Sequence, residues 1–330
     1  MKTTASHTIR PGLTALAIAS LLAAVACVLA IAAPVASAAT TPPEASANYK
    51  IVTLDNQNDP TFNQLLGIDN AGLIAGYFGS GATGHPNKGY LLASPYGQGN
   101  YKSENVTGAV ETQVTGLNGT GTTVGFFVDK EGDSHGFYAI RGRPFHTVDF
   151  PAHNNSKPQV DQLLGVNESD VAVGFYTAKD GMTHGFSYDI STQRFHTVTV
   201  AGDSNLTAAA INNEGDIAGF ATNSAGVTVA FLARPGSQPI ELSVPGSTST
   251  QALGVNDGDE VAGDYTVAGE GGATDTHGFV WSPGFGFETV NDANGIDTTT
   301  INGVNDRGDL VGFYTDADEN TDGLLATPEV

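Results

Sequence analysis

Cysteine is nearly absent from this sequence of 330 residues, whose single one is Cys27. It lies in an uncharged apolar run that follows Lys2 and Arg10 and ends in the small residues Ala36-Ser37-Ala38. A basic start, an apolar run and a small-residue cleavage site are typical of an export signal. Cleavage after Ala38 would leave a chain without disulfides, which must be stabilised by packing alone.

We therefore expect a signal peptide over residues 1–38, a short linker over 39–48 and one folded domain over 49–330. The product would be secreted, either extracellular or periplasmic, and would have no membrane span after cleavage. Two alternatives stay open. The apolar run is about long enough to cross a bilayer as an uncleaved anchor. Cys27 could instead carry a lipid, although Ala24-Val25-Ala26 is a poor lipidation motif and more apolar sequence follows it.

Basic residues are also scarce. The 13 Lys and Arg stand against 35 Asp and Glu, which gives a formal net charge of −22. The predicted signal contains two of the basic residues and no acidic one, so the mature chain is more acidic still. A surface of this sign repels nucleic acid and anionic lipid. Nucleic acid is therefore excluded as a partner.

Catalytic motifs are missing as well. The sequence contains no Gly-x-Ser-x-Gly, no His-Glu-x-x-His, no phosphate-binding loop and no dinucleotide fingerprint. After Ala38, no ten-residue stretch combines helical periodicity with capping residues. These absences favour an all-β domain and give no support to an ordinary enzyme.

What the sequence does have is a repeat. Six segments of the type Leu-Gly-Val-Asn are each followed about nine residues later by a second glycine. These second glycines lie 44 to 49 residues apart, at Gly76, Gly125, Gly174, Gly219, Gly263 and Gly312. A period in this range marks an architecture in which each unit buries its apolar face only against its neighbours.

Each repeat contains four strand-like runs. In the third copy they cover residues 162–167, 171–177, 184–189 and 195–200, each rich in β-branched and aromatic residues and bounded by turn residues. Asn or Asp with Gly between the first two runs predicts a hairpin. Four antiparallel strands per unit, six times over, predict an all-β, six-bladed β-propeller. A β-solenoid is the main alternative, but its rungs are usually shorter and it needs capping units.

The phase of the repeat predicts how the ring closes. The domain opens with a fourth-strand run, residues 49–54, and ends after a third-strand run, residues 323–326. The last blade therefore lacks one strand, and the N-terminal run supplies it. Such closure would cover two sheet edges that otherwise invite aggregation.

The glycines and aromatics of the repeat have structural explanations. Inner propeller strands crowd toward the axis, so glycines such as Gly165 and Gly174 are expected where a side chain would prevent close approach. We assign the aromatics after each second glycine to the core between blades: Tyr77, Phe126, Phe175, Phe220 and Phe313. Those of the third strands are assigned there too: Phe137, Phe186, Phe231 and Phe279.

At these residues the sequence resembles the HAF family of extracellular repeat proteins. Its units join a Gly-Ile/Val-Asn-Asp-x-Gly-x-Ile/Val-Gly stretch to a following His-Ala-Phe. The matching tracts are Gly254-Val255-Asn256-Asp257 with Val261-Ala262-Gly263, and Gly303-Val304-Asn305-Asp306 with Leu310-Val311-Gly312. The triplet departs from the pattern, because it is His-Gly-Phe at 135–137, 184–186 and 277–279. The resemblance covers essentially the whole mature chain and implies export and repeats, without a defined activity.

Two groups of residues are candidates for metal binding. His135, His184 and His277 share one repeat position, but equivalent positions lie about a blade apart, so we assign them a structural role at the turn. Oxygen-bearing side chains alternate along one acidic loop, a spacing that suits Ca²⁺. Asp316, Asp318, Asn320 and Asp322 are thus a candidate for weak calcium binding, with a solvated acidic turn as the alternative. No other cofactor is expected.

Positions that break the repeat are the remaining candidates for function. Asp264 replaces an aromatic found in the other five copies, Trp281 is the only tryptophan, and Arg234 stands in a very acidic chain. The main hypothesis is an exported, monomeric, non-enzymatic propeller that binds an envelope glycan or protein. The alternative is a carbohydrate-active lyase or hydrolase, in which Asp264, His277 and Arg234 would open into one pocket.

Overall fold

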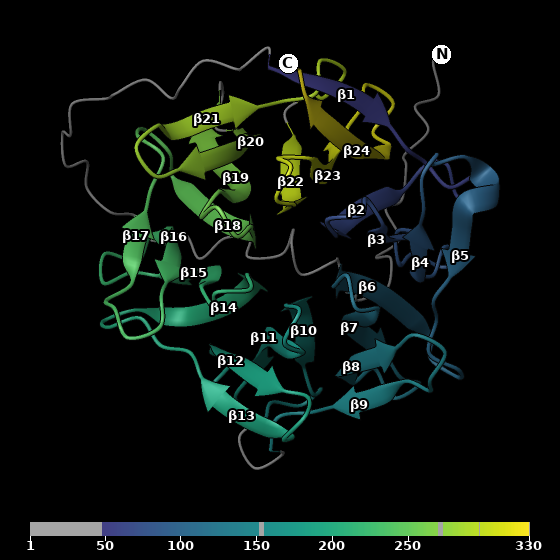
Figure 1. Cartoon of the computed structure of the whole chain (residues 1–330), viewed down its shortest axis with the longest axis horizontal. Helices are drawn as coiled ribbons and strands as arrows, with labels where there is room; N and C mark the ends of the chain where they lie inside the picture. Colours follow the sequence, from purple (N-terminus) through teal and green to yellow (C-terminus); the bar gives the residue numbers. More distant parts are fainter. Residues whose placement is uncertain (1–47, 152–154, 270–272, 297, 330) are drawn as a thin grey trace, which may run out of the picture.

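The computed structural model describes residues 48–151, 155–269, 273–296 and 298–329. In these residues 24 strands form six antiparallel sheets of four strands, arranged as blades around a central axis (Figure 1). The predicted six-bladed propeller is thereby confirmed. The predicted signal peptide lies outside the described residues, as does the linker apart from Asn48. No helix in the described ranges is long and apolar enough to cross a membrane.

The first three blades follow the chain order from the inner to the outer strand. Blade 1 contains β2 (Asn63–Ile68), β3 (Ile74–Phe78), β4 (Lys88–Leu92) and β5 (Tyr101–Ser103), with a 3₁₀ turn η1 (Gln98–Asn100) before β5. Blade 2 contains β6 (Glu111–Leu117), β7 (Thr122–Val128), β8 (Ser134–Ile140) and β9 (His146–Val148). Blade 3 contains β10 (Asp161–Val166), β11 (Val171–Thr177), β12 (Thr183–Asp189) and β13 (Arg194–Thr197).

The next two blades repeat this order, and the sixth combines both ends of the domain. Blade 4 contains β14 (Ser204–Ile211), β15 (Ile217–Thr222), β16 (Thr228–Ala233) and β17 (Ile240–Leu242). Blade 5 contains β18 (Ser249–Val255), β19 (Val261–Ala268), β20 (Thr274–Ser282) and β21 (Gly286–Val290). Blade 6 contains β22 (Thr299–Val304), β23 (Leu310–Thr315), β24 (Thr321–Pro328) and β1 (Tyr49–Thr53).

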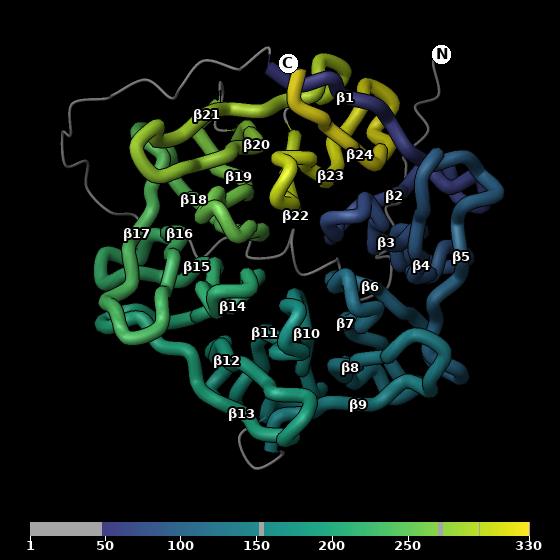
Figure 2. The backbone as a smooth tube through the Cα atoms, viewed as in Figure 1, coloured from purple at the N-terminus to yellow at the C-terminus, as the bar shows by residue number. Residues whose placement is uncertain are grey.

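The ring closes as the repeat phase predicts. β1 is the outer strand of blade 6 and pairs antiparallel with β24, from Tyr49 opposite Pro328 to Thr53 opposite Leu324. Figure 2 shows the purple start of the domain lying along its yellow end. The backbone N–H of Glu329 also donates to the carbonyl of Asn48 at 2.8 Å. The first and last described residues are therefore neighbours.

Two sets of glycines permit the close packing of the inner strands. Each inner strand has a β-bulge before its central glycine or alanine, for example between Leu163 and Gly165. A Cβ on Gly165 would lie 3.1 Å from the Cα of Ala210 in the next blade. A Cβ on Gly174 would lie 1.9 Å from the carbonyl oxygen of Gln162. The predicted structural role of these glycines is confirmed, because a side chain at either place would force backbone atoms apart.

The hydrophobic core consists of clusters between neighbouring blades. The third-strand phenylalanines occupy it as expected, and Phe137, Phe186 and Phe279 are fully buried. The second-strand aromatics pack against inner strands. Phe220 of blade 4 packs with Ala209 of its own blade, Leu164 of blade 3 and Leu253 of blade 5. Phe220 therefore lies between blades as expected, and the other second-strand aromatics, Tyr77, Phe126, Phe175 and Phe313, are buried as well.

Candidate binding sites on the propeller axis

One end of the axis is formed by the turns that join the first and second strand of each blade. In five of the six turns, a side-chain amide donates to the backbone carbonyl at the same position of the next blade, over 2.8 to 3.1 Å. We call this set the Asn ladder: Asn118, Asn167, Asn212, Asn256 and Asn305, ending on the carbonyl of Asp69. It links five of the six blade junctions at turns that the sequence had indicated only as hairpins.

A second set of contacts runs parallel to the Asn ladder, one residue later in each turn. Here the backbone N–H of one blade donates to the side chain of the next, over 2.7 to 2.9 Å. We call this set the turn ladder: Gly119, Glu168, Asn213, Asp257, Asp306 and Asn70. It gives this end of the axis several carboxylates in a chain that is already strongly acidic.

Both ladders are interrupted at the same junction. Asp69 stands where the other blades have Asn, and its carboxylate has no N–H to donate to blade 2. It accepts from the backbone of its own turn instead, at Ala71 and Leu73, both 2.8 Å. Gly119 has no side chain to accept from Asn70. Among the described residues, the junction of blades 1 and 2 therefore carries neither ladder contact.

The ladders surround a cavity of about 140 Å³ that we call the turn-end cavity. It is lined by residues 66–70 of blade 1 and the corresponding residues of the other five blades. Carboxylates of Glu168, Asp257 and Asp306 stand at its mouth, and leucines such as Leu164 and Leu253 lie at its floor. Negative charge at the mouth of a narrow cavity favours cations and disfavours anions.

The opposite end of the axis holds a larger cavity of about 230 Å³, which we call the loop-end cavity. Residues of blades 2, 3 and 4 line it, including the phenyl rings of Phe126, Phe175 and Phe220. The amides of Gln113 and Gln162 accompany the rings, because each glutamine pairs directly with a phenylalanine across the first two strands. The cavity thus combines flat apolar surfaces with hydrogen-bonding groups.

The rest of the loop-end cavity is uncharged. Asn205 and threonines of β6, β12, β14, β15 and β16 line it together with Leu164, Gly181 and Ala221. None of the described residues that line it is Asp, Glu, His, Lys, Arg, Tyr or Cys. Asn205 has a φ of +49°, a left-handed conformation that is uncommon outside glycine. Its side-chain oxygen accepts from the backbone N–H of Thr183 at 3.3 Å, a contact that joins Asn205 of blade 4 to blade 3.

Sequence reasoning missed this cavity, although a signal was present. Gln64, Gln113, Gln162 and Gln251 recur at one position of the inner strands, where a buried strand would normally carry an apolar residue. A repeated amide in a buried strand indicates a polar lining rather than a packed core. Combined with the recurring aromatics of the second strands, it could have located this end of the axis.

The repeat-breaking residue Asp264 lies on β19 beside the axis. It is only 5% exposed, and no described residue donates a hydrogen bond or forms an ion pair with its carboxylate. Burial raises the pKa of Asp264 to about 7. A carboxylate without partners in such a place is costly, so the residue needs a reason beyond packing.

The structure does not bring Asp264, His277 and Arg234 into one pocket. Asp264 pairs with Gly278, whereas His277 pairs with Tyr265, so adjacent register positions place the two side chains on opposite faces of blade 5. Arg234 follows β16 and binds Asp259 at 2.7 Å in the turn between β18 and β19. Trp281, on β20, pairs with Phe287 on β21, and both pack at the edge of an inter-blade cluster.

The repeated histidines lie against aromatic rings and do not converge. His135 stacks on Phe127, and the equivalent pairs in blades 3 and 5 are His184 with Tyr176 and His277 with Tyr265, with centroid distances of 5.2 to 5.3 Å. Each pair joins the second and third strands of one blade. This geometry supports the structural role expected from their spacing.

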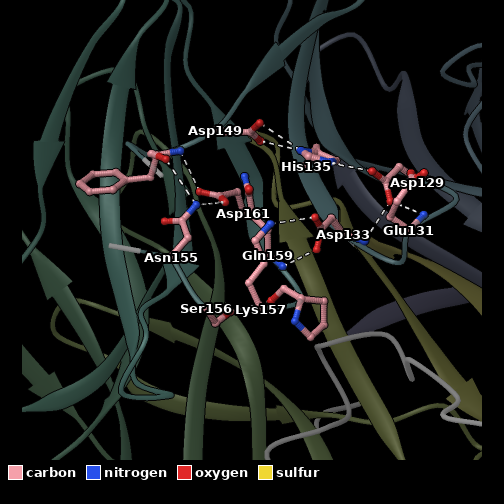
Figure 3. Close-up of polar contacts among 12 residues, drawn as sticks. Asp129, Glu131, Asp133, His135, Asp149, Asn155, Ser156, Lys157, Gln159 and Asp161 are labelled. Carbon is pink, nitrogen blue, oxygen red and sulfur yellow. Dashed lines mark hydrogen bonds and ion pairs between the residues drawn. The ribbon is translucent and has the colours of Figure 1, made fainter. Parts of the chain in front are cut away.

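His135 has the strongest polar environment of the three (Figure 3). Its Nδ1 lies 3.0 Å from Asp149 Oδ2, and its Nε2 lies 3.3 Å from Asp129 Oδ2. Burial opposes a charged imidazole, but the hydrogen bonds and charges of the two carboxylates outweigh it and raise the pKa of His135. The histidine thus fastens the segment after β9 to the hairpin between β7 and β8.

The rest of this cluster holds the crossover from blade 2 to blade 3. Asp133 accepts from the N–H of Gln159 at 2.6 Å. Asp161 accepts from the N–H of Phe150 at 2.8 Å and from the amide of Asn155 at 2.7 Å. Burial raises the pKa of Asp161 to about 7. The carboxylates of this cluster accept hydrogen bonds from the chain that crosses between the blades, so we assign the cluster a structural role.

His135 makes the stability of the protein depend on pH. A histidine whose pKa is raised by folding stabilises fully below its unfolded value of about 6.5, and this contribution is lost as the pH rises through the folded pKa. The melting temperature of His135→Gln should therefore fall furthest below wild type at acidic pH, and the difference should shrink toward pH 8.5. His184→Gln removes a stacked histidine that has no carboxylate partner and serves as the control. A difference that is the same at all pH values would contradict the assignment.

The calcium candidate lies in the loop between β23 and β24. Asp316 Oδ1 accepts from the N–H of Asp318 at 2.9 Å and of Asn320 at 2.8 Å. Asn223 of blade 4 makes the same contacts with an uncharged amide, at 3.0 and 3.1 Å. Asp322 is 8% exposed and Asp318 is exposed. No group of three or more His, Cys, Asp or Glu in the described ranges is arranged to share an ion. Calcium binding here stays a prediction.

The comparisons with known proteins identify the fold alone. No protein-family model and no curated protein matches the sequence. A Dyadobacter fermentans protein of unknown function superimposes with a TM-score of 0.55 at 10% identity, over 86% of this chain and 99% of the other. A protein of Agrobacterium tumefaciens provisionally named TolB gives 0.55 at 12%, over 86% and 100%. The SapL1 lectin, solved with α-methyl fucoside, gives 0.52 at 12%, over 80% and 91%.

Proposed function

We propose that this protein is an exported, non-enzymatic binding module that holds a neutral glycan of the cell envelope in the loop-end cavity. The observation that carries the proposal is the lining of this cavity by phenyl rings, amides and hydroxyls without a titratable group. A pyranose ring presents one apolar face and several hydroxyls, which match such a lining. Export and the HAF-type repeat belong to the same proposal, and both rest on the sequence.

The absence of charge in the cavity favours binding over catalysis. Lyases and glycoside hydrolases need a general acid and a general base, usually carboxylates, within reach of the bond that breaks. The described residues of the loop-end cavity supply neither. A lectin with a bound sugar is among the structures of similar fold, so this fold is compatible with the proposed class of ligand.

A blocking substitution tests the proposal. Thr228 lines the cavity at the start of β16 and is partly exposed, so Thr228→Trp should fill the site with little effect on folding. A monosaccharide of about 12 heavy atoms, at roughly 0.3–0.5 kcal/mol per atom, should bind with a Kd of about 0.04–2 mM. We expect calorimetric titration to detect one of the neutral methyl hexosides or methyl fucosides with wild type, and no binding with Thr228→Trp.

The repeat offers a matched control. Thr276 is the equivalent residue of blade 5, because it lies three positions before the third-strand phenylalanine, as Thr228 does in blade 4. Thr276→Trp adds the same ring outside the cavity and should bind sugar like wild type. Equal loss in both variants, or undiminished binding in Thr228→Trp, would place the ligand elsewhere. Turnover of a glycan by the wild type would replace the binding module by an enzyme.

A further inference from the structure

Two departures from the repeat occur in neighbouring blades. Asp264 of blade 5 stands where the other five blades have Phe or Tyr. Asn302 of blade 6 stands at a position that is leucine in blades 1, 3 and 5, as at Leu253. Each change puts an oxygen into a layer that is otherwise largely apolar, so their coincidence in adjacent blades is informative.

The fold places these two positions against each other. In the preceding pair of blades, Phe220 of blade 4 packs with Leu253 of blade 5 in one axial cluster. Asp264 is the blade 5 equivalent of Phe220, and Asn302 is the blade 6 equivalent of Leu253. β19, which carries Asp264, packs against β22, which carries Asn302. A carboxylate and an amide thus replace a phenyl ring and a leucine at one contact.

The oxygens at this contact have no donors. The amide nitrogen of Asn302 donates to the carbonyl of Leu65 at 2.9 Å, which fixes the orientation of the group. Its Oδ1 is buried and has no hydrogen-bond partner among the described residues. The carboxylate of Asp264 has none either, and both residues are at most 5% exposed. An acceptor buried without a donor, such as Asn302 Oδ1, and a carboxylate that is largely withdrawn from water are both unfavourable unless a positive charge lies near them.

Access and charge favour a cation. Asn302 lines the turn-end cavity, so a small ion entering between Glu168, Asp257 and Asp306 reaches its side chain. Gln251 pairs directly with Asp264 and adds an amide next to the carboxylate. The candidate ligands are one carboxylate, that of Asp264, and the amide oxygens of Asn302 and Gln251. A divalent ion in a protein usually binds more than one carboxylate. One negative charge suits an ion of a single positive charge.

We propose that Asp264 and Asn302 bind a small, singly charged cation at the junction of blades 5 and 6. Oxygens of both side chains, which lack hydrogen-bond donors among the described residues, coordinate the ion. The ion thereby joins the two blades at the axis. This site is separate from the loop-end cavity over blades 2, 3 and 4, so the two proposals stand or fall independently.

Thermal unfolding in different salts tests the site. At constant ionic strength and pH 8, with Asp264 mostly ionised, sodium or potassium chloride is compared with the chloride of N-methyl-D-glucamine, whose cation is too large for the cavity. We expect a melting temperature higher by about 4 °C or more in at least one of the small cations. Line broadening of the ²³Na resonance by the protein gives a second measurement for the sodium arm.

Substitution by the residues of the neighbouring junction removes the site while keeping a packed contact. The double variant Asp264→Phe with Asn302→Leu reproduces the Phe220–Leu253 pair and should lose the cation-specific shift. Asp264→Asn keeps the shape of the side chain and loses its charge, so it should weaken binding of the ion at least tenfold. This single variant provides the test if the double variant does not fold. Glu241→Gln removes an exposed carboxylate on the outer strand β17, outside both cavities, and should retain the shift. Equal melting temperatures in all three salts, or a shift that survives both Asp264 variants, would overturn the proposal.

Discussion

Deletion of β1, residues 49–53, should destabilise the whole propeller by about 3–5 kcal/mol and lower its melting temperature by roughly 10 °C. The strand forms five backbone pairs with β24, and Tyr49 and Ile51 pack on the core of blade 6. Its loss removes hydrogen bonds worth about 1 kcal/mol each and part of an apolar cover. It also exposes an edge strand that can pair with other molecules.

A circular permutant separates the strand from its position in the sequence. Asn48 and Glu329 are hydrogen-bonded neighbours, so a short loop can join them and new ends can be made after Leu54. This permutant keeps β1 next to β24 as an ordinary hairpin and should melt within a few degrees of wild type. Differential scanning calorimetry measures both proteins, and light scattering detects association of the truncated one. A truncated chain that stays monomeric with an unchanged melting temperature would show that β1 does not close the ring.

Gly174→Ala should be among the most damaging additions of a single methyl group to the first two strands of a blade, together with the same change at Gly263 and Gly312. The new Cβ would lie 1.9 Å from the carbonyl oxygen of Gln162, a backbone atom that cannot move without separating β10 from β11. Overpacking against a rigid neighbour costs about 3 kcal/mol or more, which corresponds to a fall of roughly 6–12 °C in melting temperature.

Gly99→Ala is the matched control for this substitution. A Cβ at Gly99 meets no atom within 4 Å, and its backbone is not in the left-handed region. It should change stability by less than about 0.5 kcal/mol. Chemical denaturation of the three proteins gives the comparison. A Gly174→Ala protein as stable as Gly99→Ala would mean that the two inner strands lie further apart than described.

The sequence predicted the ring because its signals are local. Turn residues, alternating strands and glycines spaced 44 to 49 residues apart recur in every repeat, and closure by residues 49–54 follows from counting strands. Signals within one repeat do not predict which side chains line the axis. Gln162 and Phe175 form a regular pair, but their place in the lining of the loop-end cavity depends on how blades 2, 3 and 4 meet around the axis.

The placement of Asp264 and Asn302 on two strands that pack together was beyond sequence reasoning for a different reason. The two residues belong to different repeats, and each alone resembles a tolerated exception. Only the order of the blades makes them neighbours, through β19 and β22.

The interruption of the Asn and turn ladders makes the six junctions mechanically unequal. To separate the turns of two adjacent blades at any of the five linked junctions, at least two hydrogen bonds must break. Between blades 1 and 2, the described turns can move apart without breaking any ladder contact. Widening of the turn-end mouth therefore begins at Asp69 and Gly119, on the far side of blade 1 from blade 6, whose β1–β24 pair joins the two ends of the domain.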